Sequence, residues 1–113
     1  MQYALLIYDH PAAHDVPDDE REKITGEYMA ISGEDAVVGG SQLQPPETAT
    51  TVRVEGGETL TTDGPFVDTK EFLGGFFLLE ADNLDAALAV AERIPAARYG
   101  GCVEVRPIVE RPA

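Results

Sequence analysis

The stretch EFLGGFFLLEA, residues 71–81, decides the fold because its side chains are apolar at both odd and even positions. A strand with one face in water alternates apolar and polar residues, whereas a strand covered on both faces is apolar throughout. The segment QYALLIY, residues 2–8, is also apolar at both parities. We therefore predict that these two segments are the central strands of one sheet.

Two helices are predicted, one after each central strand. Residues 18–31 begin with acidic side chains, which the positive end of the helix dipole favours. The second helix follows Asp82, which we expect to cap its N-terminus. Its apolar face consists of five residues at helical spacing: Leu84, Ala87, Leu88, Ala91 and Ile94.

Further β-segments complete the chain. Residues 36–40 form a short strand, residues 48–62 an inserted hairpin and residues 101–109 the last strand. Pro107 has no N–H to donate to a ladder, which places the last strand at an edge of the sheet or marks the fraying end of this strand. The order βαββαβ, with the hairpin before the third main strand, predicts a ferredoxin-like α+β fold in a single domain, residues 1–113.

Two helices can cover only one face of such a sheet. The other face of both central strands is apolar as well, and no segment of the chain is left to cover it. A second copy, packed sheet to sheet by two-fold symmetry, is the simplest cover. We therefore predict a homodimer.

The composition is that of an acidic globular protein, with 21 Asp and Glu against 8 Lys and Arg and a net charge of −13. Such a surface repels phosphate backbones and anionic membranes, so we expect neither direct nucleic-acid binding nor membrane binding. The single cysteine, Cys102, indicates a reducing compartment, and the N-terminus has no basic region of a signal peptide. We predict a cytoplasmic protein in which Cys102 is a buried structural thiol.

Asp63, in the turn TTDGPF, is the best single candidate for a working carboxylate. An Asx-turn needs the N–H two residues later, and Pro65 has none. Asp63 therefore binds the N–H of Phe66, finds another partner or stays free. Two interpretations stay open: a structural turn that Phe66 packs down, and a proton acceptor close to Lys70.

Glu104 and Arg106 form the polar side of the last strand. Val103 and Val105 suit the face that the helices cover, so the two charged residues point to the face that we assign to the dimer. Charges in an enclosed apolar space must be paired or functional. An ion pair at the rim and a role in ligand binding are both compatible with this pattern.

Gly74 and Gly75 lie inside a predicted strand, where glycine weakens packing. A β-bulge or a close backbone approach would explain them, and so would room for a ligand beside Phe76. In the loop DHPAAHD, Pro11 prevents the helical geometry that a metal site of two histidines would need. An acid/base pair of a histidine and an aspartate from this loop stays a hypothesis.

Five blocks of the sequence resemble the YCII-related proteins, specifically the subgroup named for its Asp-Gly-Pro-Phe (DGPF) motif. The blocks are YALLIY, GGSQLQPPETATTVR, TDGPFVDTKEFLGGFFL, NLDAALAVAERIPAA and VEVRPI, in this order. The resemblance implies a dimeric α+β barrel. It also implies relatives that look like small-molecule lyases or isomerases, and links of the subgroup to extracytoplasmic-function sigma factors. The His–Asp pair ascribed to the YCII branch has no counterpart in these blocks, since His10 and His14 lie outside them.

Three functions fit these observations. The first is a small-molecule-binding homodimer that acts as an accessory to regulation, with a pocket between the sheet and the inserted hairpin. The others are a cofactor-independent lyase or isomerase for an enol or aromatic substrate, and a protein-interaction module. No phosphate-binding loop, nucleophile elbow or zinc spacing occurs, so we expect neither cofactor nor metal. A deep pocket that contains Asp63, Arg106 or a loop histidine, with at least one desolvated carboxylate, would indicate the enzyme. We assign catalysis to Asp63, Arg106 and His14, and ligand contacts to Tyr8, Phe66, Lys70, Phe76 and Glu104.

Overall fold

The computed structural model describes residues 1–66 and 69–112. The main elements follow one another as β1 (Gln2–Asp9), α1 (Asp18–Ser32), β2 (Val37–Gln42), β3 (Thr50–Glu55), β4 (Glu58–Asp63), β5 (Phe72–Glu80), α2 (Leu84–Ala91) and β6 (Cys102–Pro107). Short 3-10 turns cover Pro11–His14, Pro46–Thr48 and Pro95–Arg98. The element order is the predicted one. No helix among the described residues is long and apolar enough to cross a membrane.

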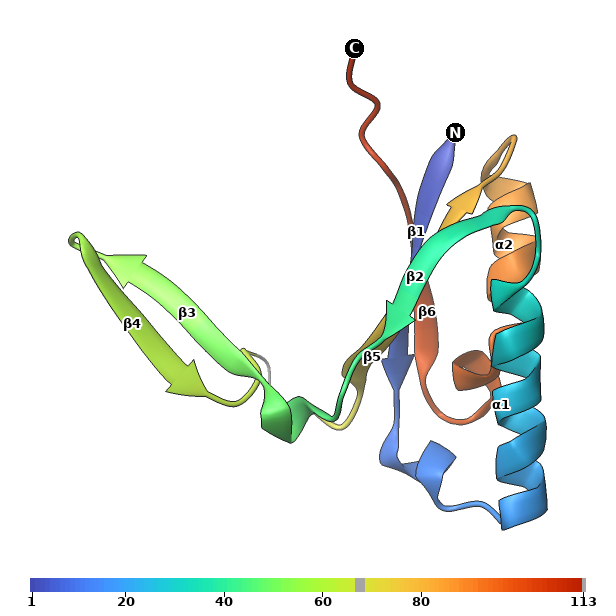
Figure 1. Ribbon diagram of the computed structural model, residues 1–113, viewed down its shortest axis with the longest axis horizontal. Helices are drawn as coiled ribbons and strands as arrows, with labels where there is room; N and C mark the ends of the chain where they lie inside the picture. Colours follow the sequence, from blue (N-terminus) through green and yellow to red (C-terminus); the bar gives the residue numbers. More distant parts are fainter. Residues whose placement is uncertain (67–68, 113) are drawn as a thin grey trace.

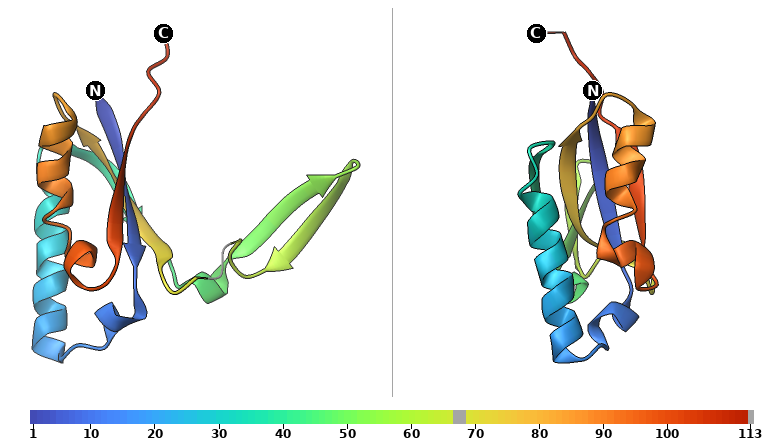
Figure 2. Two further views of the ribbon diagram at one scale, coloured as in Figure 1. Left: turned by 180° about the vertical axis from the view of Figure 1, so that it is seen from behind. Right: turned by 90° about the vertical axis from the view of Figure 1, so that its right-hand side faces the viewer.

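The main sheet has four antiparallel strands in the order β2-β5-β1-β6. The two segments that are apolar at both parities are its central strands, and β6, which ends at Pro107, lies at an edge, as predicted. Both helices lie on one side of the sheet (Figures 1 and 2). This arrangement is ferredoxin-like.

The core lies between the sheet and the helices. Tyr3, Leu5 and Ile7 of β1 are buried on this side, whereas the alternate residues are only partly buried. The remaining buried apolar residues come from both helices, from β5 and from the turn after α2: Ile31, Phe77, Leu79, Ala87, Ala91, Ile94 and Ala96. The side of the sheet away from the helices, which we call the open face, therefore has no cover from the described residues of a single chain.

The open face carries the residues that the strand pairing places on the same side as Leu6. Phe76 and Glu104 are the partners of Leu6 on its two neighbouring strands. Ala4 likewise pairs with Leu78 of β5 and with Arg106 of β6. The open face is thus apolar over the central strands and charged at β6.

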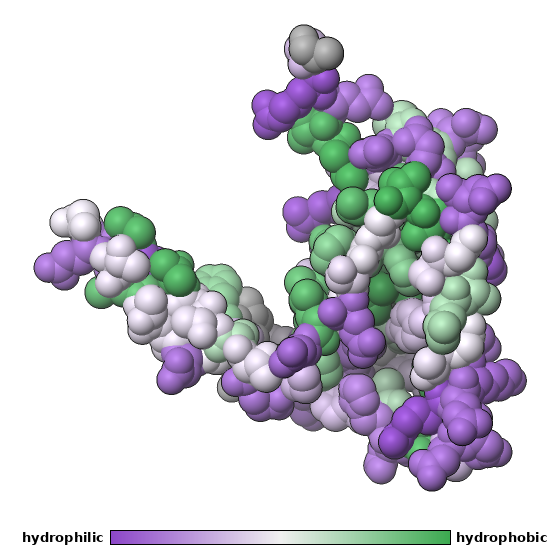
Figure 3. All heavy atoms as spheres, in the orientation of Figure 1, coloured by the Kyte–Doolittle hydropathy of each residue, from purple (hydrophilic) through white to green (hydrophobic). Residues whose placement is uncertain are grey.

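The hairpin of β3 and β4, which we call the arm (residues 50–63), projects from the body on the side of the open face (Figure 1). It turns at Gly56 and Gly57, whose φ angles of 57° and 82° suit the two-residue hairpin turn that the sequence predicted. The radius of gyration is 16.1 Å, against about 13 Å for a compact chain of this size. Figure 3 shows the hollow between the arm and the body, with apolar residues along its wall.

Three local predictions are wrong. The N-cap of α2 is Asn83 rather than Asp82: its side-chain oxygen accepts from the N–H of Ala86 at 2.9 Å, because Asn83 directly precedes the first helical residue. Leu84 and Leu88, both predicted on the apolar face, are 48% and 44% exposed, because α2 packs on the sheet through small residues such as Ala87. Cys102 is exposed, because the strand pairing with Tyr8 places it on the open face.

Candidate functional site

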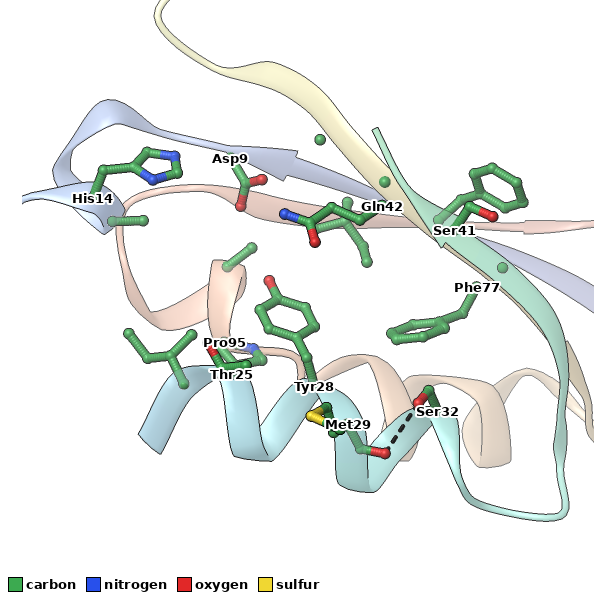
Figure 4. Close-up of a pocket in the computed structure, with 18 of the residues that line it drawn as sticks. Asp9, His14, Thr25, Tyr28, Met29, Ser32, Ser41, Gln42, Phe77 and Pro95 are labelled. Atoms are coloured by element: carbon green, nitrogen blue, oxygen red, sulfur yellow. Dashed lines mark hydrogen bonds between the residues drawn. The ribbon is translucent and has the colours of Figure 1, made fainter. Parts of the chain in front are cut away.

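A cavity of about 470 Å³ lies between α1 and the sheet, at the end of the sheet where β1 ends (Figure 4). We call it the helix-side pocket. Its apolar wall includes Ile7 and Phe77 of the sheet and Pro95 of the turn after α2. Its polar side chains come from the end of β1, the loop that follows it, α1 and β2: Asp9, His14, Arg21, Thr25, Tyr28, Ser32 and Gln42.

Asp9 is the last residue of β1, and its side chain enters the pocket because Gly74 makes room for it. The pairing of β1 with β5 passes from Ile7–Gly75 to Tyr8–Leu73, so Gly74 is the extra residue of a β-bulge. A Cβ on Gly74 would overlap the Asp9 carboxylate. The glycine pair thus serves as the predicted bulge, and the space that it leaves is occupied by a carboxylate.

Burial is the main cause of the raised pKa of Asp9. The pKa of this carboxyl is raised because the protein removes water from the charged form, and the nearby His14 acts in the opposite direction. A carboxylate with a raised pKa is a stronger base than an ordinary carboxylate, so it accepts a proton more readily near neutral pH. Asp9 therefore has the property of a general base.

His14 borders the same pocket from the loop between β1 and α1. Its ring is parallel to the ring of Phe72 within 8°, with 6.4 Å between the centroids. Arg21 of α1 donates to the backbone oxygen of His14 at 2.9 Å, which attaches the loop to the helix. His10 has a different role, because its Nδ1 accepts from the N–H of Ala12 at 3.0 Å and so caps the 3-10 turn.

Tyr28 brings a phenol into the pocket from α1. Burial and the charge of Asp9 raise the pKa of Tyr28 to about 12, although the backbone of Ala96 and the charge of Arg98 act against this. The group is therefore protonated at neutral pH and can donate a hydrogen bond. Figure 4 shows its hydroxyl directed toward the strands, on the side where Asp9 and Gln42 lie.

The DGPF segment lies at the base of the arm rather than in the helix-side pocket. Asp63 is exposed at the end of β4, opposite Thr50. The turn is held by its backbone, since the N–H of Gly64 donates to Ala49 O at 2.7 Å and Thr51 Oγ1 donates to Gly64 O at 2.8 Å. This backbone anchoring gives the motif a structural role in fixing the arm.

Two other predicted site residues, Phe66 and Lys70, are also exposed near the base of the arm. The guanidinium of Arg53 lies 4.7 Å from the centre of the Phe66 ring, a distance typical of a cation–π contact. Phe66 therefore packs on the arm, and these two residues lie outside the lining of the helix-side pocket.

The remaining predicted site residues divide between the pocket and the open face. His14 and Phe76 both border the pocket, although the pairing of Phe76 with Leu6 directs its side chain to the open face. Arg106 donates to Glu104 at 3.3 Å in an exposed ion pair. Tyr8 lies on the open face too, so a role of these residues in ligand binding stays a prediction that concerns the space between two copies.

The sequence indicated Asp9 only as one of the two aspartates of the loop DHPAAHD that could pair with a histidine, and it did not indicate Tyr28 or Gln42 as site residues. For Asp9 a signal exists, because it ends a central strand and a glycine pair stands in the neighbouring central strand. For Tyr28 and Gln42 the sequence carries no such signal, because the two side chains reach the same pocket only through the way in which α1 and β2 pack. Within the described ranges, no group of three or more histidine, cysteine, aspartate and glutamate side chains is placed to hold a metal.

A ferredoxin-like domain with a polar pocket between its first helix and its sheet defines the class of this protein. The chain belongs to the family of YCII-related domains, which matches residues 1–111. It is 35% identical over 114 residues to an uncharacterized protein of Rhizobium meliloti (strain 1021), covering 96% of this chain and 92% of that protein. Placement in the DGPF subgroup stays a prediction.

A solved structure shares the fold. It is 5-chloro-2-hydroxyhydroquinone dehydrochlorinase (TftG) from Burkholderia phenoliruptrix AC1100, in complex with 2,5-dihydroxybenzoquinone. The TM-score is 0.53 at 17% sequence identity, and the match covers 98% of this chain and 96% of the other. This likeness confirms the predicted α+β fold.

Proposed function

We propose that the protein is a cytoplasmic, small-molecule-binding homodimer whose helix-side pocket performs cofactor-independent acid/base chemistry. The reaction is of the lyase or isomerase type, on a small enol or aromatic substrate. The observation that carries this proposal is the desolvated carboxylate of Asp9, placed beside a loop histidine and a protonated phenol in one pocket. This combination is the one expected of an enzyme, whereas a simple binding protein needs no acid/base pair.

In the proposed reaction, the Asp9 carboxylate accepts a proton from an O–H or C–H group of the substrate. The electron pair of that bond moves into the substrate to form a new double bond. In an elimination, a leaving group departs with the electrons that it shared with carbon. In an isomerisation, the proton returns to another carbon, so that both reactions balance without an oxidant or reductant.

Tyr28 and His14 support the proton transfer. Tyr28, with a pKa of about 12, keeps its proton at neutral pH and donates a hydrogen bond to the substrate oxygen that gains negative charge. His14 is exposed at the border of the pocket, so it can carry a proton between Asp9 and water. Its positive form also favours the charged state of Asp9.

The size and lining of the pocket set the substrate class. A volume of about 470 Å³ lies within the range of small-molecule sites, about 300 to 1,000 Å³. Phe77 provides a flat apolar wall, and Gln42 provides a polar group that can orient hydroxyls. A hydroxylated six-membered ring fits this description, and the dehydrochlorinase that shares the fold suggests the probes.

The test uses 5-chloro-2-hydroxyhydroquinone as substrate and 2,5-dihydroxybenzoquinone as ligand. We expect chloride release by the wild type, and a decrease of about 100-fold or more in Asp9→Asn and His14→Asn, as for loss of a general acid or base. Asp15→Asn and His10→Asn are the matched controls, because these side chains do not line the pocket. The control His10→Asn also keeps a side-chain acceptor for the Ala12 N–H.

Three results would contradict the proposal. Chloride release that is unchanged in Asp9→Asn would remove its central residue. Binding of 2,5-dihydroxybenzoquinone by the wild type without chloride release would point to a ligand-binding role instead of an enzyme. Failure of the wild type to bind either probe would exclude the hydroxylated-ring substrate class.

A further inference from the structure

The arm is exposed to solvent on both of its faces. Val52 and Val54 are 60% and 67% exposed, and no residue of β4 is buried. An isolated two-stranded hairpin is only marginally stable in water. The described part of one chain therefore does not provide the packing that would stabilise the arm.

The two faces of the arm differ in charge. Residues paired directly across an antiparallel hairpin point to the same side. Val52 pairs with Thr61 and Val54 pairs with Thr59, and these four residues form what we call the uncharged face of the arm. Glu55 pairs with Glu58 at the tip of the other side, which we call the charged face.

The charged face is already engaged by its own chain. Arg53 and its partner Leu60 belong to it, and the Arg53 guanidinium covers the ring of Phe66 at 4.7 Å. The two glutamates at the tip of this face, Glu55 and Glu58, favour contact with water. The uncharged face has no comparable contact among the described residues, so it is the face that is suited to bind a partner.

The partner that fits best is a second copy of this chain. The arm projects on the side of the open face (Figures 1 and 3), so a body that stacks on the open face must also meet the arm. Two chains that each carry −13 repel each other, so a largely uncharged contact favours their association. The uncharged face of the arm and the apolar centre of the open face, around Leu6 and Phe76, are such surfaces.

Opposite charges at the margins of these two surfaces support the same partner. Asp63 stands at the base of the arm on the side of Val52, as the register shows. Arg106 stands on the open face and is 68% exposed in its ion pair with Glu104. Two-fold symmetry would form each contact twice and would add the arm to the area of the stacked sheets, toward the roughly 800 Å² per subunit that stable dimers bury.

We propose that the arm is a dimer clamp, which reaches beyond its own subunit and binds a second copy through Val52, Val54, Thr59 and Thr61. The proposal does not depend on the chemistry of the helix-side pocket. It adds a contact between the arm and the second copy to the contact between the two stacked sheets.

The test compares acidic substitutions on the two faces of the arm in the full-length chain. Sedimentation velocity over a dilution series gives the dissociation constant of the dimer. Val54→Glu should raise it by about tenfold or more, because the interface would bury an unpaired carboxylate. Leu60→Glu, on the charged face, and Leu88→Glu, on α2, should leave it nearly unchanged. Circular dichroism checks that each variant is folded.

Three results would overturn the proposal. They are a wild type that stays monomeric at all concentrations, a Val54→Glu dimer as tight as the wild type, and equal weakening by Val54→Glu and Leu60→Glu. Chloride release by the same variants is measured separately. It distinguishes a failure of the clamp from a failure of the pocket chemistry, since the Asp9→Asn variant should still form dimers.

Discussion

The body and the arm of this protein are built from the same kind of β-sequence but are held in different ways. In the body, Leu5 and Leu79 are fully buried between sheet and helices. In the arm, Val52 occupies an equally regular strand and is 60% exposed. Strand pattern and turn chemistry specify local structure in both regions, whereas only the body has a core of its own. The stability of the body is therefore internal, whereas we propose that a partner stabilises the arm.

The largest expected effect compares one core leucine with one arm valine. Leu5→Ala should lower the free energy of unfolding by between about 2 and 5 kcal/mol, since it opens a cavity in a fully buried site. Val52→Ala should change it by no more than about 0.5 kcal/mol, as for exposed positions. Urea denaturation at one dilute protein concentration measures both. Equal losses would show that the arm belongs to the same cooperative core.

Two glycines give the next comparison, because each is needed for a different reason. Gly74→Ala would place a methyl group on the Asp9 carboxylate, and we expect a loss of about 1 to 3 kcal/mol from this overpacking. Gly57, at φ 82°, has open space around it, so its substitution strains only the turn of the arm. Global unfolding should therefore respond to Gly74→Ala and hardly to Gly57→Ala.

The affinity of the two glycine variants for 2,5-dihydroxybenzoquinone gives a second comparison. Gly74→Ala should weaken binding, because it displaces Asp9, whereas Gly57→Ala should leave binding unchanged. A Gly74→Ala variant with wild-type affinity would show that the position of Asp9 is not set by the bulge.

A smaller effect is expected at the start of α2. Asn83→Ala removes the side-chain acceptor for the Ala86 N–H and should cost about 1 kcal/mol, the usual value for an N-cap. Asp82→Ala should cost less, because the cap geometry belongs to Asn83. Thermal unfolding of the two variants checks this, and the reverse order would restore Asp82 as the cap.

The smallest effect is the pH dependence that Asp9 contributes. Its pKa is higher in the folded state than in the unfolded chain, so the folded state binds more protons between these two values. The contribution to stability is fully present below the unfolded pKa and is lost as the pH rises through the folded pKa. Asp9→Asn should therefore gain stability relative to the wild type at neutral pH and lose this advantage in acid, which urea denaturation at both pH values measures.

Most of the body could be predicted from the sequence, because its signals are local. Apolar residues at both parities identified the central strands, Pro107 indicated the edge strand, and Gly56 with Gly57 indicated the hairpin turn. The cap of α2 was missed by one residue, because Asp and Asn are both good caps and the position of the first helical turn decides between them.

The site was harder to predict, since it depends on contacts between distant segments. Asp9 enters the pocket only because Gly74, on a neighbouring strand, leaves room for its carboxylate. Tyr28 looks like a core residue of α1, and its meeting with Asp9 depends on how the helix lies on the sheet. The direction of the arm was equally inaccessible, because a hairpin pattern does not say whether the hairpin folds back or projects.

The central claim is that Asp9 is a desolvated carboxylate coupled to His14. Its most direct test is a titration of the Asp9 side-chain carboxyl carbon by NMR, in the wild type and in His14→Asn. We predict a pKa above the ordinary value of about 3.9 and a further rise in the variant, because His14 lowers the pKa of Asp9. An ordinary pKa that does not respond to the loss of His14 would contradict the account.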